Sequence, residues 1–147
     1  MPDVLRFPDI RPGQRFRTAS RTVTVEEIKA FAAEYDPQPF HLDEAAAAGS
    51  VFGALVASGW HTAALAMRLF VDGGLPIAGG IIGRAIDELR WPVPVRPGDT
   101  LTGESEVLEV IPSASRPGTG RARVACRMFN QDGELAMSYI VTLVVRA

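Results

Sequence analysis

Residues 58–71 read SGWHTAALAMRLFV, and this segment decides the fold. Its side chains are apolar around almost the whole circumference of a helix, and Arg68 is the one charged residue among them. A helix that is apolar on every side is normally buried, and one of this length is too short to cross a bilayer. We therefore predict that Gly59 to Val71 forms the most buried helix, ended by Gly73-Gly74-Leu75-Pro76.

The chain before this helix is expected to hold one strand and then shorter helices. Residues 14–23 are typical of an extended segment, and Thr24 with Glu27 forms a capping box that starts a helix. That helix should stop at Asp36, because a residue before proline resists the helical conformation. The segment DPQPFHLD, residues 36–43, is interpreted as a stiff loop, and DEAAAAG after it as a short helix.

The chain after this helix reads as strands. They are predicted over residues 79–91, 100–111, 121–130 and 135–145, with a long hairpin loop over residues 112–120. The third alternates cleanly, with its apolar face made by Ala122, Val124, Cys126 and Met128. Strands that follow helices indicate an α+β fold with an antiparallel sheet. We expect one long central helix wrapped by a curved antiparallel sheet.

Length and composition narrow the class of protein. A chain of 147 residues predicts a single domain over residues 1–147. A net charge of −2 without a basic run gives no reason to expect nucleic acid. The start, MPDVLRFPDI, lacks an apolar signal core, so no membrane partner is expected and the cytoplasm is the expected location. The single cysteine, Cys126, cannot form an internal disulfide.

Asp36 and His41 are the first candidate site residues. They flank a loop stiffened by Pro37 and Pro39, so their side chains can converge at low entropic cost. A carboxylate and an imidazole that converge on one position can hold and polarise a water molecule there. The alternative is an aspartate that caps a turn and a histidine that packs, and the spacing alone favours this alternative.

Ser58 and Gly59 mark the entry of the buried helix. The first amides of a helix lack partners and lie at the positive end of its dipole, so a carbonyl placed there would be stabilised as it gains charge. The alternative is a serine cap and a glycine chosen for close packing, which the two residues alone favour.

The other polar residues have structural interpretations. His41, Asp43 and Asp36 supply three possible metal ligands, but no metal-binding pattern accompanies them and no metal is expected. His61 is interpreted as a packing or surface histidine, Arg68 as half of a structural pair, and Cys126 as a core residue rather than a nucleophile.

Taken together, FAAEYDPQPFHLDEAAAAGSVFGALVASGWHTAALAMRLF, residues 31–70, resembles the MaoC-type dehydratases, a family that includes the (R)-specific enoyl-CoA hydratases. The hallmark is an aspartate, a histidine five residues later, an aspartate two residues after that, and a glycine opening a long apolar helix. The stretch ELRWPVPVRPGDTL, residues 88–101, is also similar. The resemblance covers nearly the whole chain.

The resemblance implies a hot-dog fold in a dimer, with Asp36 and His41 activating water and the Gly59 amide holding a thioester carbonyl. Three positions depart from the family: Gln38 stands for Asn, Ser58 for His, and Met67 for a Ser found in some members. The third departure bears on the acyl pocket, for which Ser58, Trp60 and Met67 are candidates.

The function implied is reversible hydration of a 2-enoyl-CoA, a hydro-lyase reaction of fatty-acyl metabolism with an acyl-CoA partner and no cofactor. A hot-dog thioesterase is the alternative enzyme, although residues 60–71 lack the acidic residue that it would use. A non-catalytic acyl-CoA-binding module is the alternative outside catalysis. Acyl chain length and the nature of the thiol carrier stay open.

Overall fold

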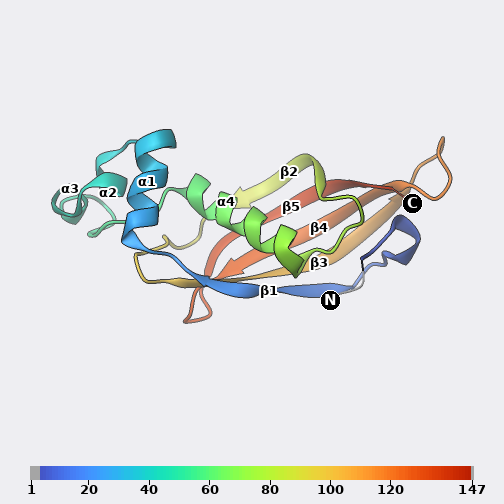
Figure 1. The fold of residues 1–147 in the computed structure, drawn as a ribbon, viewed down its shortest axis with the longest axis horizontal. Coiled ribbons are helices and arrows are strands. Elements are labelled where there is room, and N and C mark those ends of the chain that lie inside the picture. The colour runs from blue at the N-terminus through green and yellow to red at the C-terminus, as the bar shows by residue number, and fades with distance from the viewer. Residues whose placement is uncertain (1–3, 147) are drawn as a thin grey trace.

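The computed structural model describes residues 4–146, and its central element is a five-stranded antiparallel sheet with one long helix lying across a face (Figure 1). The spatial order is β1-β3-β4-β5-β2. The strands are β1 (Arg15–Thr22), β2 (Ile82–Arg90), β3 (Thr100–Pro112), β4 (Gly120–Phe129) and β5 (Leu135–Val145). The predicted α+β class and each predicted strand are confirmed.

Apolar residues alternate with more exposed residues along the strands, and the apolar residues form the part of the core that the sheet supplies. In β4 the predicted apolar face, Ala122, Val124, Cys126 and Met128, is buried. β3 and β4 pair from Thr102↔Phe129 to Pro112↔Gly120, so residues 113–119 form the predicted hairpin loop. The long central ladders of β3, β4 and β5 therefore form a continuous floor for the helix.

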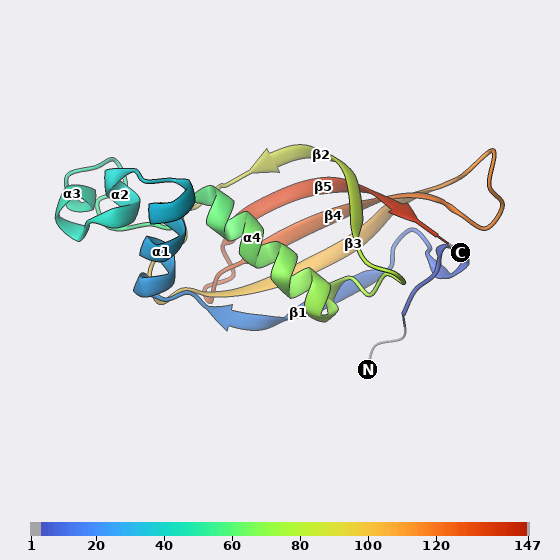
Figure 2. The ribbon, with the colours of Figure 1, turned by 45° about the horizontal axis from the view of Figure 1, so that its top comes forward.

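Three helices, α1 (Val25–Tyr35), α2 (Pro39–Leu42) and α3 (Glu44–Ala48), gather at one end of this floor, and α4 (Gly59–Leu69) runs from that end across it (Figures 1 and 2). A 3-10 turn spans Phe7–Asp9 and a π-helical turn spans Phe70–Gly74. Thr24 Oγ1 accepts from the Glu27 amide at 3.2 Å, and α1 ends before Asp36, as predicted. The prediction of a loop over residues 36–43 was wrong in part, because Pro39 opens the single turn of α2.

α4 packs on the sheet through one face only. Leu65, Ala66 and Leu69 are buried, whereas Trp60 is 60% and Met67 45% exposed. The expectation of burial on all sides was therefore wrong for the chain by itself, because the sheet covers one side of the helix. The opposite face of α4 is left as an apolar stripe.

β2 is an exposed edge of the sheet. It pairs only with β5, and Ile82 and Ile86 are about half exposed. Figure 2 shows β2 at the margin of the sheet, beyond the face that α4 covers. Among residues 4–146, no helix has both the length and the apolarity needed to cross a membrane.

Candidate functional site

Asp36 and His41 meet where α1 ends and α2 begins. The Asp36 Oδ2 and His41 Nε2 atoms are 3.3 Å apart. Asp36 is the C-terminal cap of α1, and His41 lies in the single turn of α2, with Pro37 and Pro39 between them. The two prolines restrict the connecting backbone. The structure thus brings together the pair that the sequence singled out.

The Asp36 carboxylate is held by two donors. Ser58 Oγ donates to Asp36 Oδ2 at 2.6 Å, and Gln38 Nε2 donates to Asp36 Oδ1 at 2.6 Å. The bond from Ser58 is the main cause that lowers the pKa of Asp36 below its ordinary value; burial opposes it, and Gln38 and His41 add to the lowering. Asp36 is therefore a carboxylate at neutral pH.

The His41 ring has a fixed orientation. It is buried, and its Nδ1 lies 2.7 Å from the Val56 carbonyl oxygen. Since a carbonyl only accepts, Nδ1 carries the proton in this bond. In the neutral form of this tautomer the bare Nε2 faces the Asp36 carboxylate, so two acceptors face each other. A water molecule that donates one hydrogen to each would satisfy both and leave its oxygen lone pairs free.

Gly59 lies beside this pair at the wall of a cavity of about 470 Å³. It is the first residue of α4, whose leading amides have no acceptor within the helix. The Trp91 indole covers Gly59, and Trp91 Nε1 donates to the Gly59 carbonyl at 3.0 Å. A Cβ at Gly59 would lie 2.7 Å from Trp91 Cε2, so any larger residue here must displace the indole. Asp36 and His41 line the same cavity.

The three predicted pocket residues occupy different places. Trp60 lines the cavity with Asp36 and His41. Ser58 is fully buried and does not line it; its hydroxyl instead binds Asp36 and accepts from the Trp60 amide at 3.3 Å. Met67 lines a second cavity farther along α4. Ser58 therefore acts on the carboxylate and not on the substrate pocket.

Two residues of the site were missed by the sequence reasoning. Gln38 was noted only as a departure from Asn, yet it holds Asp36; its polar side chain two residues after an aspartate was the signal. Trp91 carried no signal, because only the tertiary fold places its ring against Gly59 and edge-to-face with Trp60, with centroids 5.4 Å apart.

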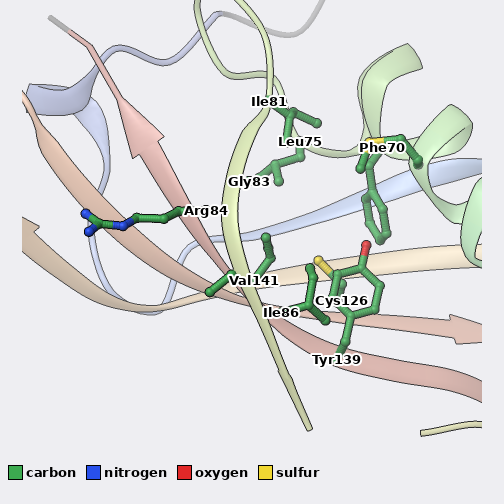
Figure 3. Close-up of a pocket in the computed structure, with 11 residues that line it drawn as sticks. Phe70, Leu75, Ile81, Gly83, Arg84, Ile86, Cys126, Tyr139 and Val141 are labelled. Carbon is green, nitrogen blue, oxygen red and sulfur yellow. The ribbon is translucent and has the colours of Figure 1, made fainter. Parts of the chain in front are cut away.

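The second cavity, of about 460 Å³, lies between α4 and β2 (Figure 3). Its side chains are mostly apolar, and the polar ones are Arg84, Cys126 and Tyr139. Burial raises the pKa of Cys126 to about 12, so its thiol is protonated at neutral pH. Cys126 is thus a core residue, as predicted, and not a nucleophile.

The residues weighed as metal ligands have other partners. Asp43 Oδ1 accepts from the amides of Ala45 at 2.8 Å and Ala46 at 3.5 Å, so Asp43 caps α3. Within the part of the chain that the structure describes, no group of three His, Cys, Asp or Glu side chains is arranged to hold a metal. Arg68 pairs with Asp72 at 2.8 Å on the surface, in the structural role predicted for it.

Removing the Ser58 hydroxyl is expected to move the acidic limb of the activity profile to higher pH. Without this donor the pKa of Asp36 rises, so the carboxylate is lost earlier as the pH falls. Loss of the α4 cap should also cost about 1 kcal/mol of stability. The measurement is kcat/KM against pH for Ser58→Ala, with Ser58→Thr as the variant that keeps the hydroxyl. An acidic limb that stays in place in Ser58→Ala would contradict this role.

His61 is expected to weaken the fold at mildly acidic pH. It is buried, it stacks on Phe31 with centroids 4.8 Å apart, and its Nδ1 has no partner among the described residues. Burial lowers the pKa of His61, although the charge of Glu27 opposes this. The unfolded chain therefore takes up the proton first, and stability present above the ordinary histidine pKa is lost as pH falls below it.

The measurement for His61 is the free energy of unfolding at pH 8 and pH 5.5. We expect the fall between the two to be smaller in His61→Leu than in the wild type. An equal fall in both proteins would show that other groups cause it.

The comparisons with known proteins agree on one family. The family model described as MaoC like domain matches residues 9–125. The chain is 32% identical to the uncharacterized protein YdeM of Bacillus subtilis, over 90% of this chain and 97% of the relative. It is 35% identical to the (R)-specific enoyl-CoA hydratase of Aeromonas caviae, over 86% of this chain and 88% of the relative.

A solved structure gives the same result for the fold. The crystal structure of a MaoC-like dehydratase from Rhodospirillum rubrum superposes with a TM-score of 0.94 at 51% identity, covering 97% of each chain. The predicted hot-dog fold is confirmed by this likeness together with the antiparallel sheet and its central helix.

Proposed function

Because the chain belongs to the MaoC-like family, whose relatives include hydratases and dehydratases of acyl thioesters, we propose that it adds water reversibly to a 2-enoyl-CoA. The observation that supports this most directly is the facing pair Asp36 Oδ2 and His41 Nε2, 3.3 Å apart at the wall of a cavity. The two acceptors suit a water molecule that must lose a proton as it attacks carbon.

In the proposed reaction the water held by Asp36 and His41 adds its oxygen to the β-carbon. One proton of the water passes to His41 Nε2, while the electron pair of the double bond moves toward the thioester oxygen. The protonated pair then delivers a proton to the α-carbon, so one water is consumed and no other reactant is needed. The bond from His41 Nδ1 to Val56 keeps the ring in place during both transfers.

The thioester oxygen gains negative charge in the transition state. We assign its stabilisation to the Gly59 amide and the positive end of the α4 dipole, a kind of interaction worth about 100- to 1,000-fold in rate per donor. The thioester itself activates the alkene. The second cavity, at Met67, is proposed to take the acyl chain, since its walls are mostly apolar.

The decisive experiment is mass spectrometry of products from a panel of enoyl-CoA thioesters. A mass gain of one water supports a hydratase, free CoA would identify the alternative thioesterase, and no change on any substrate would identify a binding module. We propose the (R)-3-hydroxyacyl product on the likeness to the Aeromonas caviae enzyme, whose name states that specificity. Chiral analysis showing mainly the (S) product would overturn this part.

We also propose that the protein is a homodimer formed through β2 and the open face of α4. Exposed apolar side chains lie on both elements: Trp60 and Met67 on α4, with Val71 in the π-helical turn that follows it, and Ile82 and Ile86 on β2. The outer edge of β2 has no strand partner among the described residues, and such an open edge is a template for a second copy.

Light scattering at micromolar concentration is expected to show at least a dimer. Ile86→Glu should weaken the assembly, whereas Leu108→Glu on β3, a similarly exposed position away from this edge, should not. A stable wild-type monomer would overturn the assignment.

A further inference from the structure

Thr62 is a buried polar residue of the catalytic cavity that the mechanism above does not use. It lies in α4, is only 1% exposed, and lines the same cavity as Asp36 and His41. Among the described residues that line this cavity, it is the one with a hydroxyl group. Its hydrogen bonds therefore bear on what the cavity holds.

The Thr62 hydroxyl has no hydrogen-bond partner among residues 4–146. A threonine inside a helix can bond the carbonyl four residues earlier. Here that carbonyl, of Ser58, accepts from the backbone amides of His61 at 3.0 Å and Thr62 at 3.1 Å. The hydroxyl is also not sealed in the core, as His61 Nδ1 is. The small accessible part of Thr62 is therefore its hydroxyl, and it faces the cavity.

Thr18 shows the usual situation of a buried threonine. Its Oγ1 accepts from the Gly103 amide at 2.7 Å and donates to the Ala19 carbonyl at 2.7 Å. An unpaired hydroxyl in the interior costs free energy, and valine would fill the same space without that cost. The hydroxyl of Thr62 therefore indicates a partner that enters from the cavity.

The place of Thr62 on α4 brings this hydroxyl to the side of the catalytic pair. Residues four apart on a helix share a face, with about 5–6 Å between their Cβ atoms, so Thr62 follows Ser58 by one turn. Ser58 Oγ donates to Asp36 Oδ2 at 2.6 Å, which shows that this face of α4 is turned toward the carboxylate.

The chemistry of the pair leaves room for a donor and not for a third acceptor. Asp36 Oδ2 and the bare His41 Nε2 both accept, so a water molecule between them uses both of its hydrogens. The oxygen of that water keeps two lone pairs. A hydroxyl that donates to one of them leaves the other lone pair for the attack on carbon.

We propose that the Thr62 hydroxyl donates a hydrogen bond to the reacting oxygen, which is water before hydration and the 3-hydroxyl oxygen of the product after it. This inference rests on the proposed function. Thr62 exchanges no proton with the substrate. Its donor stabilises the negative charge that the oxygen gains when His41 takes a proton from the water, and the same charge when the oxygen leaves during dehydration.

The first test compares two variants of Thr62 in steady-state kinetics on crotonyl-CoA. Thr62→Val keeps the shape and removes the hydroxyl, so kcat should fall about 10-fold, the equivalent of one hydrogen bond to a partly charged oxygen. The KM should stay within about two-fold, because the thioester end of the substrate keeps its contacts. Thr62→Ser keeps the hydroxyl and should retain kcat within about three-fold. Equal kcat in Thr62→Val and the wild type would overturn the proposal.

The second test uses stability to separate this role from a structural one. Because the Thr62 hydroxyl has no protein partner, Thr62→Val should melt within about 2 °C of the wild type or above it. Thr18→Val is the matched control. It leaves the buried Gly103 amide unpaired, so its Tm should fall by about 3–10 °C while kcat is kept. A Tm of Thr62→Val as low as that of Thr18→Val would overturn the proposal, since the hydroxyl would then be paired within the protein.

The third test measures binding in place of turnover. Calorimetry compares (R)-3-hydroxybutyryl-CoA with butyryl-CoA, which lacks the 3-oxygen, in an Asp36→Asn background where turnover is slow. Adding Thr62→Val should weaken binding of the hydroxylated ligand about 3- to 10-fold and leave binding of butyryl-CoA unchanged. An equal change for both ligands, or none, would overturn the proposal.

The binding test also keeps the two proposals apart. If the wild type hydrates no enoyl thioester, the proposed function fails. The same two ligands, measured on the wild type and on Thr62→Val, then decide whether Thr62 recognises the 3-oxygen, and a wild type that binds neither ligand overturns both proposals.

Discussion

Asp36→Asn and His41→Ala are each expected to lower kcat by about 100- to 10,000-fold, the usual contribution of a positioned acid–base group. Asp36→Asn keeps the size of the side chain and removes its charge. The amide oxygen can still accept from Gln38 Nε2, while the Ser58 hydroxyl must turn to accept from the amide nitrogen. His41→Ala removes the nitrogen that would take the proton from water. Circular dichroism should show that both variants are folded.

The double variant is the sharper measurement. If Asp36 and His41 act on one water molecule, their losses do not add, and the double variant should be little worse than the worse single variant. Steady-state kinetics on the best enoyl-CoA gives the comparison. His61→Ala is the control, because His61 is the other histidine of the chain and lies outside the cavity walls.

Two outcomes would contradict this mechanism. One is activity within a few-fold of the wild type in both single variants, with His61→Ala inactive. The other is a double variant whose loss equals the product of the single losses, which would mean that the two side chains act on separate steps.

The sequence was sufficient to predict the helices and strands whose local patterns are strong. The Thr24 cap and the alternation of Ala122, Val124, Cys126 and Met128 depend on nearest neighbours and on one buried face, and both appear as predicted. The one-turn helix α2 was missed, because its start at Pro39 looks the same as a proline-stiffened loop. Local patterns therefore predicted element type better than the detail of the connecting segment.

The open face of α4 shows a different limit. Apolar residues around a whole helix say that every side is covered, but not whether the same chain covers it. Met67 and Trp60 are exposed because the sheet lies on the other side, and the proposed second subunit would supply the missing cover. On this proposal, the apolar circumference of α4 reflects contacts in the dimer as well as contacts within one chain.

The site was predictable to the extent that its motif is local. Asp36 and His41 are five residues apart, and their approach follows from the loop between them. Ser58 comes from 22 residues away and Trp91 contacts Gly59 from 32 residues away, so neither contact could be read from spacing. Both contacts depend on how α4 enters the fold.

Gly59→Ala is expected to be nearly as damaging as loss of the acid–base pair. A methyl group there would lie 2.7 Å from Trp91 Cε2 and 2.9 Å from Trp91 Nε1, so the indole must leave its place at the cavity wall. We expect about 1–3 kcal/mol of lost stability from this overpacking. We also expect a fall in kcat of about 100- to 1,000-fold as the thioester carbonyl loses its donor geometry.

The two effects can be separated by removing the indole. In a Trp91→Ala background the added methyl group has room, so the stability cost of Gly59→Ala should disappear. If the Gly59 backbone also binds the thioester, the loss in kcat relative to Trp91→Ala alone should persist, because the methyl group then occupies the path of the carbonyl.

Gly83→Ala, where a new Cβ meets Val141 at an ordinary 3.5 Å, controls for the general effect of replacing a glycine. Thermal unfolding and kcat are measured for the wild type, Gly59→Ala, Trp91→Ala and the double variant. The comparison separates the effect of Gly59→Ala on stability from its effect on catalysis. Equal kcat in Trp91→Ala with and without Gly59→Ala would mean that Gly59 is required only by the packing of Trp91.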